Sequence, residues 1–231
     1  MRPAWILIAY AAVGAANVVG AATDATALAD ATKPLLMPLL LVWVLVASRG
    51  AGSDRVLRWL EAGIAAAWLG DLLLMGEGDL WFAGGLAAFL VMQLCYLRSI
   101  TLIPGPGLVR AWRIAIVPYV LLWLALNALV LPGAGDMRIP VLVYSTVIIV
   151  TAVAALDLVL RVPRPLGWRV AFGALVFVLS DALIAMTAFG PLSPAPAWSA
   201  VIMATYVVAQ AMIVTGLTGC SLARDAVPVR R

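Results

Sequence analysis

The chain has 231 residues, of which 65% are hydrophobic and 11% charged, and its mean hydropathy is +1.09. This small number of polar side chains could not cover a water-facing surface. The composition therefore excludes a soluble domain of any size and indicates an integral membrane protein. The formal net charge is +4. Arginines beside anionic lipid headgroups explain this excess without a nucleic-acid partner.

Eight apolar stretches follow one another, separated by short loops. Most reach the ~20 residues that a helix rising ~1.5 Å per residue needs to cross a ~30 Å hydrocarbon core. Continuous apolar runs lack the alternation of barrel strands, so we expect an all-α bundle of eight transmembrane helices forming one integral membrane domain. The predicted helices span about 4–22, 34–47, 57–75, 80–103, 111–131, 139–160, 168–189 and 197–217.

The first two predicted helices can each be interpreted in more than one way. The first follows Arg2 and could pass for a signal peptide, but seven more spans follow, so we interpret it as an uncleaved helix. The second is short and contains Pro34 and Pro38. Because a proline in the first turn of a helix removes no hydrogen bond, we place the start of this helix at Pro34.

Basic residues fall almost entirely on one side of the predicted bundle. Only Lys33 and Arg138 lie on the other side. Cytoplasmic loops carry the positive excess, so both termini are predicted to be cytoplasmic. The residues on the cytoplasmic side are Arg2, Arg49, Arg55, Arg58, Arg98, Arg110, Arg113, Arg161, Arg164, Arg169, Arg224, Arg230 and Arg231.

The sequence lacks the common signatures of metal and nucleotide sites. It contains no His, and its acidic residues do not have the spacing of a zinc or iron site. Cys95 lies within the fourth predicted helix and Cys220 at the inner end of the eighth, which favours neither a disulfide nor a metal site. Nucleophile-elbow and Walker motifs are also absent. We therefore expect no metal, nucleotide or redox cofactor.

Two of the four acidic residues within the predicted spans lie near the inner boundary. Glu61 follows Arg58 by three positions, and Asp157 precedes Arg161 by four. Each pair has the spacing of neighbours on one helix face, so we expect two ion pairs with a structural role.

Asp71 and Asp181 lie deeper in their helices. Each stands ~12 residues, or ~18 Å, past the arginine that marks the inner boundary. A carboxylate at that depth costs at least ~2.5 kcal/mol and is a candidate functional group by default. Both helices run from inside to outside, so both carboxyls lie in the outer half of the bundle. We interpret them as a catalytic pair, with interhelical hydrogen bonding as the alternative.

The segments around these aspartates resemble each other. Leu-Gly-Asp-x-Leu and Leu-Ser-Asp-x-Leu are 110 residues apart, and the same offset relates Asn17 to Asn127. This similarity would divide the chain into two parallel four-helix halves.

Further polar side chains lie at a similar level in the predicted bundle. Gln93 and Tyr96 share one face of their helix, as Tyr206 and Gln210 do, and Lys33 lies at the outer end of the second helix. Interhelical hydrogen bonding or interfacial anchoring is the alternative for each. We predict that they line a polar substrate pocket open to the outer leaflet, formed by Asn17, Lys33, Gln93, Tyr96, Tyr144, Tyr206 and Gln210.

Six segments carry a resemblance to a known family. They are TKPLLMPLL at 32–40, LGDLLLM at 69–75, FAGGLAAFLVMQLCYL at 82–97, VLVYSTVIIV at 141–150, GALVFVLSDALIA at 173–185 and YVVAQAMIVTG at 206–216. In this order and spacing the chain resembles the YhhN-like lysoplasmalogenases, which are small polytopic membrane enzymes. Their two membrane-embedded aspartates, thought to be catalytic, match Asp71 and Asp181. Gln93 stands where members commonly carry His, so no role of that His transfers to this chain.

The resemblance implies hydrolysis of the vinyl ether of a lysoplasmalogen, a lysophospholipid, to a fatty aldehyde and a glycerophospho-alcohol. Enol ethers hydrolyse by proton transfer to the β-carbon and addition of water to an oxocarbenium ion, so a protonated acid and an anionic stabiliser are both needed. Burial and a neighbouring carboxylate favour the protonated form of one aspartate. Which aspartate donates the proton stays open at this stage. Lys33 would hold the lipid phosphate.

Three other functions fit parts of the pattern. Gly70-Asp71 matches half of the intramembrane aspartyl protease motif, but the companion Tyr-Asp and Pro-Ala-Leu elements are missing. A proton-coupled transporter would also use paired membrane aspartates, and a non-catalytic lipid-binding protein would need only the pocket. The scarcity of Lys relative to Arg, together with abundant Ala and Val, indicates a GC-rich genome and hence a bacterial plasma membrane.

Overall fold

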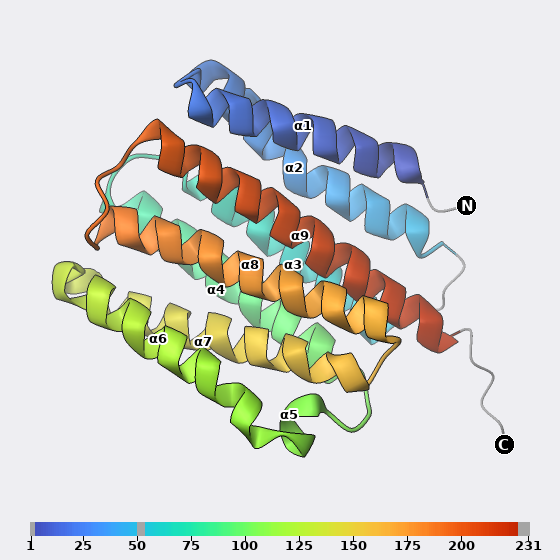
Figure 1. The fold of residues 1–231 in the computed structure, drawn as a ribbon. Helices are drawn as coiled ribbons and strands as arrows, with labels where there is room; N and C mark the ends of the chain where they lie inside the picture. The colour runs from blue at the N-terminus through green and yellow to red at the C-terminus, as the bar shows by residue number, and fades with distance from the viewer. Residues whose placement is uncertain (1–2, 50–53, 226–231) are drawn as a thin grey trace, which may run out of the picture.

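The computed structural model describes residues 3–49 and 54–225, and within these ranges it contains helices and no strands. Eight long segments run back and forth (Figure 1), which confirms the predicted all-α bundle. Short α5 (Leu108–Ala111) and η1 (Arg113–Ile116) lead into α6, and η2 (Leu131–Gly133), η3 (Gly135–Met137) and η4 (Leu158–Leu160) flank α7. The long helices are α1 (Ala4–Ala22), α2 (Thr26–Ala47), α3 (Arg55–Leu73), α4 (Asp79–Thr101), α6 (Val117–Val130), α7 (Arg138–Asp157), α8 (Arg164–Ala188) and α9 (Pro196–Asp225).

Seven of these segments are long and apolar enough to cross a membrane, so the protein is a multi-pass membrane protein. α3 is not among the seven, and it carries Arg58, Glu61 and Asp71 within its 19 residues. It packs along α2 and α4 as a member of the bundle. The charges that lower its hydropathy include the aspartate of the predicted site.

The helices pack as consecutive antiparallel pairs. α3 packs on α4, and α8 on α9, while α1 and α2 cover one side of these pairs and α6 and α7 the other (Figure 1). The first helix is an integral part of the bundle, because α1 packs on both α2 and α9 and the Tyr10 hydroxyl donates to the Val207 carbonyl at 2.8 Å. The interior between the pairs forms one apolar core.

The helix packing within the two predicted halves of the chain is similar only in part. The α3–α4 and α8–α9 pairs correspond to each other, and so do the α2–α3 and α7–α8 contacts. However, α1 packs on α9, whereas α6, its counterpart, packs on α7 and more lightly on α8. The division into two parallel four-helix halves stays a prediction.

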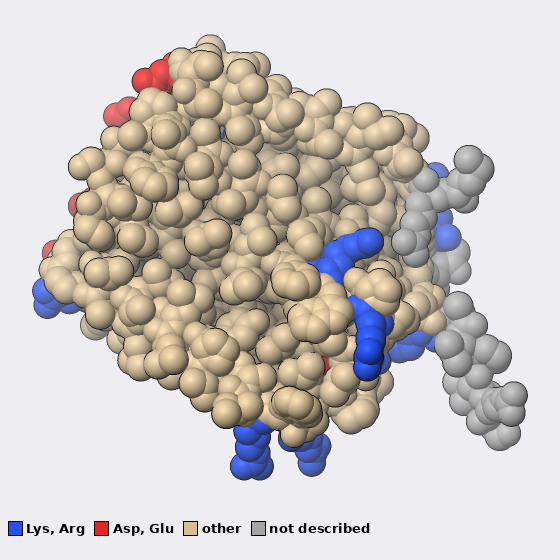
Figure 2. All heavy atoms as spheres, in the orientation of Figure 1, with Lys and Arg blue, Asp and Glu red and all other residues tan. Residues whose placement is uncertain are grey.

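Both described ends of the chain lie at the same end of the bundle, as eight successive antiparallel segments require (Figure 1). Figure 2 shows Lys and Arg gathered toward this end, a wide uncharged band, and Asp and Glu at the opposite end. The positive-inside rule makes the end with the termini the cytoplasmic one. The opposite end is called the outer end below.

The second helix differs from its prediction. α2 begins at Thr26 and contains Pro34 and Pro38 in its interior, so the predicted start at Pro34 is wrong. Because Pro38 has no N–H, it leaves the Pro34 carbonyl without its helical donor. The indole N–H of Trp68 on α3 donates to this carbonyl at 2.9 Å. A neighbouring helix thus supplies the missing hydrogen-bond donor, which lipid could not provide.

Glycines let α4 approach α3 closely. A Cβ on Gly63 would lie 2.5 Å from a ring carbon of Tyr96, and one on Gly70 would lie 2.8 Å from the ring of Phe89. Both aromatic residues are buried. Such small residues allow tight helix packing in membranes, and Gly70 fixes the position of the aromatic ring beside Asp71.

We predict that Gly63→Ala lowers the free energy of unfolding by ~1–3 kcal/mol, because the Tyr96 ring must move within a packed core. Unfolding of the purified protein in detergent measures the effect. Gly84→Ala is the matched control, since its added Cβ would meet Leu73 at an ordinary 3.5 Å. Equal stability of the two variants would contradict this packing.

Charged residues at the inner end pair with each other. The predicted ion pair between Asp157 and Arg161 is confirmed, and the Val109 N–H also donates to Asp157 at 2.7 Å. The predicted pair of Glu61 with Arg58 is wrong, because the ion pairs in the described ranges do not include either residue. Another acidic residue, Asp54, forms the N-cap of α3.

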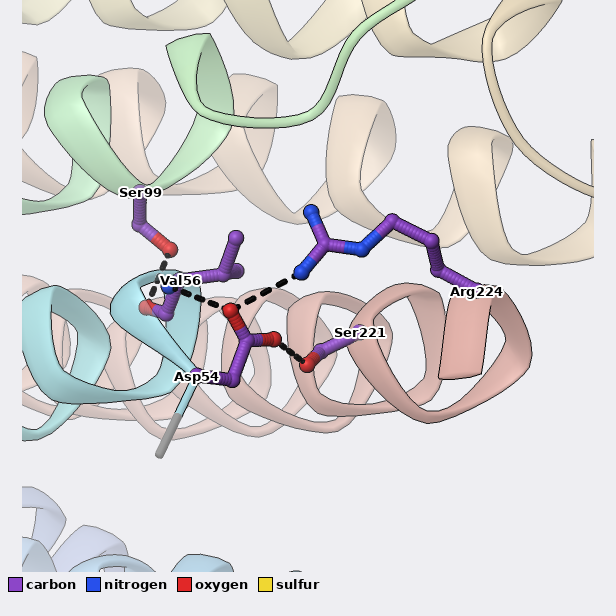
Figure 3. Close-up of polar contacts among 5 residues, drawn as sticks. All are labelled: Asp54, Val56, Ser99, Ser221 and Arg224. Atoms are coloured by element: carbon purple, nitrogen blue, oxygen red, sulfur yellow. Dashed lines mark hydrogen bonds and ion pairs between the residues drawn. The ribbon is translucent and has the colours of Figure 1, made fainter. Parts of the chain in front are cut away.

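Asp54 joins the inner ends of α3 and α9 (Figure 3). Its carboxylate accepts hydrogen bonds from the Val56 N–H at 3.0 Å, from Arg224 at 2.9 Å and from the Ser221 hydroxyl. Burial alone would raise the pKa of Asp54, but these hydrogen bonds and the Arg224 charge outweigh it and lower the pKa below its usual value. The Ser99 hydroxyl on α4 donates to the Val56 carbonyl at 2.9 Å. Three helices therefore meet at this carboxylate.

A lowered pKa in the folded state means that the ionised Asp54 stabilises the protein above the ordinary Asp pKa of about 3.9, and that this contribution is lost as the pH falls further. We predict that Asp54→Asn is less stable than wild type at neutral pH and that the two converge below about pH 4. Unfolding measured across this pH range tests it. Glu77→Gln, at an exposed carboxylate, should follow wild type throughout.

Candidate active site

Asp71 is buried near the outer end of α3, with 2% of its surface exposed. The Tyr206 hydroxyl on α9 donates to its carboxylate at 2.7 Å. The ring of Tyr206 is held edge-on by Phe89 and Phe177, at centroid distances of 6.0 and 5.9 Å. The Lys33 ammonium on α2 is near enough to act electrostatically on Asp71. Asp71 thus has both a hydrogen-bond donor and a cation to stabilise its ionised form.

Asp181 lies on α8, two turns before the outer end of that helix. The Tyr144 hydroxyl on α7 donates a hydrogen bond to its carboxylate. Gln93 on α4 is placed to hydrogen-bond the same hydroxyl. Each predicted aspartate therefore has one tyrosine from a neighbouring helix as its partner.

Asp181 lies within the electrostatic influence of Asp71, and their action as one catalytic pair stays a prediction. The aspartates come from α3 and α8, and their tyrosines from α9 and α7. Two ionised carboxylates this deep would repel each other, which favours sharing a single negative charge between them.

A cavity of about 90 Å³ lies beside Asp181, between α4, α6, α7 and α8 near the outer end. Its polar lining consists of Asp181, Tyr144, Asn127 and Ser145, and its other walls are apolar. Asp71 is not among its lining residues. The cavity therefore differs from the polar pocket predicted from the sequence. Only one of the two carboxyls borders it.

Several predicted pocket residues are instead bonded to each other. The Tyr96 hydroxyl donates to Gln210 Oε1 at 2.8 Å, and Gln210 Nε2 lies 3.3 Å from the Met92 sulfur. All three residues are buried. Gln93 and Tyr96 border a second, much smaller cavity of about 10 Å³.

Asn17 and Lys33 lie on the α1–α2 side of the site. Asn17 Nδ2 donates to the Ala29 carbonyl at 2.8 Å and to the Thr32 hydroxyl at 2.9 Å, so it joins α1 to α2. Lys33 lies two turns inside α2 rather than at its end, because the helix begins at Thr26. It is half-buried and faces Asp71 electrostatically. Substrate binding by these two residues stays a prediction.

Comparison with known families decides the assignment. The model of the YhhN family matches residues 28–217, which is most of the chain. The chain belongs to the YhhN family. Among curated proteins and solved structures, none matches it. The residues matched in this YhhN protein include both aspartates and both tyrosines bonded to them.

The described residues of this YhhN protein form no cluster of three or more His, Cys, Asp or Glu that could hold a metal ion. Cys95 and Cys220 are buried and are not joined to each other. The side chains described at the site offer carboxyls, phenols, amides, the Ser145 hydroxyl and the Lys33 ammonium.

Sequence analysis missed three residues of the site. Asn127 and Ser145 line the cavity, and their side chains are 3.1 Å apart, Ser145 Oγ to Asn127 Oδ1. Tyr10 lies close enough to Asp71 and Tyr206 to act on both electrostatically. Asn127 interrupts a strongly apolar run, which was the available signal, whereas Ser and Tyr are common enough in membrane helices to give none.

We predict that Tyr206→Phe lowers the free energy of unfolding by ~1–2 kcal/mol, because it leaves the buried Asp71 without its donor. In the Asp71→Asn background the same change should cost less, since the charge that needs the donor is gone. Tyr119→Phe, at a half-buried tyrosine on α6, is the control and should change stability little. Identical costs in both backgrounds would rule out a bond that depends on the Asp71 charge.

Proposed function

We propose that this protein hydrolyses the vinyl ether bond of a lysoplasmalogen, releasing a fatty aldehyde and a glycerophospho-alcohol. Membership of the YhhN family supports the class of enzyme. The observation that carries the proposal is the arrangement of the two carboxyls. Asp181 borders an apolar cavity within the bundle, and Asp71 is bonded to Tyr206, whose ring packs on Phe89 in the wall of the same cavity.

We propose different roles for the two aspartates. Asp181 borders the cavity, so its carboxyl can reach a bound alkenyl chain and act as the proton donor. Asp71 is covered by Tyr206 and accompanied by Lys33, which favour its ionised form. We infer that Asp71 supplies the negative charge that stabilises the cation formed in the reaction. It acts electrostatically, because it does not line the cavity.

The reaction balances with these two groups. The Asp181 carboxyl gives its proton to the β-carbon of the vinyl ether, which leaves an oxocarbenium ion at the carbon bonded to oxygen. Water adds to this carbon and returns a proton to the Asp181 carboxylate, which gives a hemiacetal. The hemiacetal then breaks its bond to the glycerol oxygen, which takes up a proton, and the aldehyde is released. The hydrogen bond from Tyr144 holds the Asp181 carboxyl in place during both transfers.

The surroundings of the site suit a single-chain lipid. The cavity walls are apolar apart from four residues, so an alkenyl chain can occupy it without losing hydrogen bonds. Lys33, on the outer half of α2, is the cation of the site and is proposed to attract the lipid phosphate. By its composition we place the protein in a bacterial plasma membrane.

We predict that Asp181→Asn lowers the rate of vinyl ether cleavage by about 10²–10⁴-fold, because the amide cannot transfer the proton. Asp71→Asn should lower the rate less, since it removes a charge that does not contact the substrate. Release of aldehyde from an alkenyl lysophospholipid by purified protein in detergent measures both. Asp136→Asn, at an exposed carboxylate of the outer end, is the control.

The same assay separates the alternatives. An alkyl lysophospholipid, which lacks the double bond, should yield no aldehyde. A proton-coupled transporter, a lipid-binding protein or an intramembrane protease would release none from either lipid. Full activity of Asp181→Asn would contradict the proposed chemistry.

A further inference from the structure

The cavity beside Asp181 has two polar places in an otherwise apolar wall. One is the Asp181–Tyr144 pair, which the proposed mechanism uses. The other is formed by Asn127 on α6 and Ser145 on α7, and the mechanism gives it no role. Two separate polar sites in an apolar cavity suit a ligand, or a pair of ligands, with two polar groups.

The hydrogen bonds of this second place leave acceptors open. Asn127 Nδ2 donates to the Trp123 carbonyl of its own helix at 2.8 Å, which fixes the amide with its oxygen turned to Ser145. Ser145 Oγ lies 3.1 Å from that oxygen and 3.0 Å from the Leu142 carbonyl. A hydroxyl has one hydrogen and can give it to only one of these acceptors. When it goes to Leu142, both side-chain oxygens are free to accept.

Two adjacent acceptors match a molecule with two donor hydrogens. Water is the smallest such molecule, and it needs two to four polar partners to be held inside a protein. The cavity of about 90 Å³ exceeds the ~10–15 Å³ that one water requires. An oxocarbenium ion or a vinyl ether has no hydrogen to donate, so the reacting part of the lipid would not occupy this place.

The position on α7 connects this place with the proton donor. Ser145 directly follows Tyr144, and successive residues of a helix point about 100° apart. One turn of α7 therefore presents Tyr144 to Asp181 and Ser145 to Asn127, and both pairs border the same cavity. A water held by the second pair lies beside a lipid that the first pair protonates.

We propose that Asn127 and Ser145 bind and orient the water that attacks the oxocarbenium carbon, an inference that rests on the proposed vinyl ether hydrolysis. The water donates a hydrogen bond to Asn127 Oδ1 or Ser145 Oγ, which raises the electron density on its oxygen. Its oxygen forms the new bond to carbon, and the proton that it loses passes to the Asp181 carboxylate. The two residues thus direct the second step of the reaction, after the proton transfer.

Competition between water and methanol tests this proposal. Methanol can attack the same oxocarbenium ion and gives a stable mixed acetal, while water gives the aldehyde. In a fixed water–methanol mixture, wild type should give a higher ratio of aldehyde to acetal than acid hydrolysis of the free lipid does. Asn127→Leu, which removes the amide at similar size, should lower this ratio about tenfold, the effect of one hydrogen bond.

Variants of Ser145 provide an independent readout. Ser145→Ala should lower the ratio as well, and Ser145→Thr, which keeps the hydroxyl, should restore it. Ser99→Ala is the matched control, because Ser99 also makes a buried bond between helices, to Val56, but at the inner end of the bundle. A general loss of packing would lower the rate in all variants without changing the product ratio.

The outcomes are distinct. A lowered ratio in Asn127→Leu and Ser145→Ala, with an unchanged ratio in Ser99→Ala, supports the water site. An unchanged ratio in Asn127→Leu and Ser145→Ala, while wild type releases aldehyde, overturns the water site and leaves the proposed function intact. Absence of aldehyde from wild type overturns the proposed function, and the water site with it.

Discussion

The need of buried polar groups for partners within the protein governs this structure. Lipid offers no hydrogen bonds, so a donor or acceptor must come from the same or a neighbouring helix. Trp68 supplies the donor that Pro38 cannot give to the Pro34 carbonyl. Tyr206 and Tyr144 do the same for the buried Asp71 and the half-buried Asp181. Each of these bonds joins two helices, and the bond from Tyr206 to Asp71 connects α9 with α3, which are far apart in the sequence.

The same constraint separates the roles of the two carboxyls. Asp71 has a donor and a nearby cation and is sealed from the cavity, whereas Asp181 has a donor and borders an apolar space. Only Asp181 can therefore contact a molecule bound in the cavity. The difference between the two environments, rather than the aspartates themselves, is what suits the pair to a reaction that needs one acid and one anion. Similar carboxyls in identical settings would offer no such division.

The depth of Asp71 and Asp181 in the membrane could be predicted from the sequence, because their distance from the inner arginines follows from the helical rise. The side chains that contact the two aspartates from other helices could not be predicted, because these contacts depend on which helices pack together. The start of α2 was misplaced because the donation by Trp68 that compensates for Pro38 comes from another helix. The predicted polar pocket likewise ignored that Tyr96 and Gln210 could satisfy each other. The apolar cavity depends on the packing of α6 against α7 and α8, which no local pattern reveals.

The central claim is that the two aspartates form one coupled pair in which Asp181 carries the proton. Infrared absorption of the purified protein at neutral pH tests this most directly, because a protonated carboxyl absorbs apart from a carboxylate. We predict a protonated-carboxyl band in wild type that disappears in Asp181→Asn and shifts in Asp71→Asn. A band that survives unchanged in Asp181→Asn, or that is missing from wild type, would contradict the account.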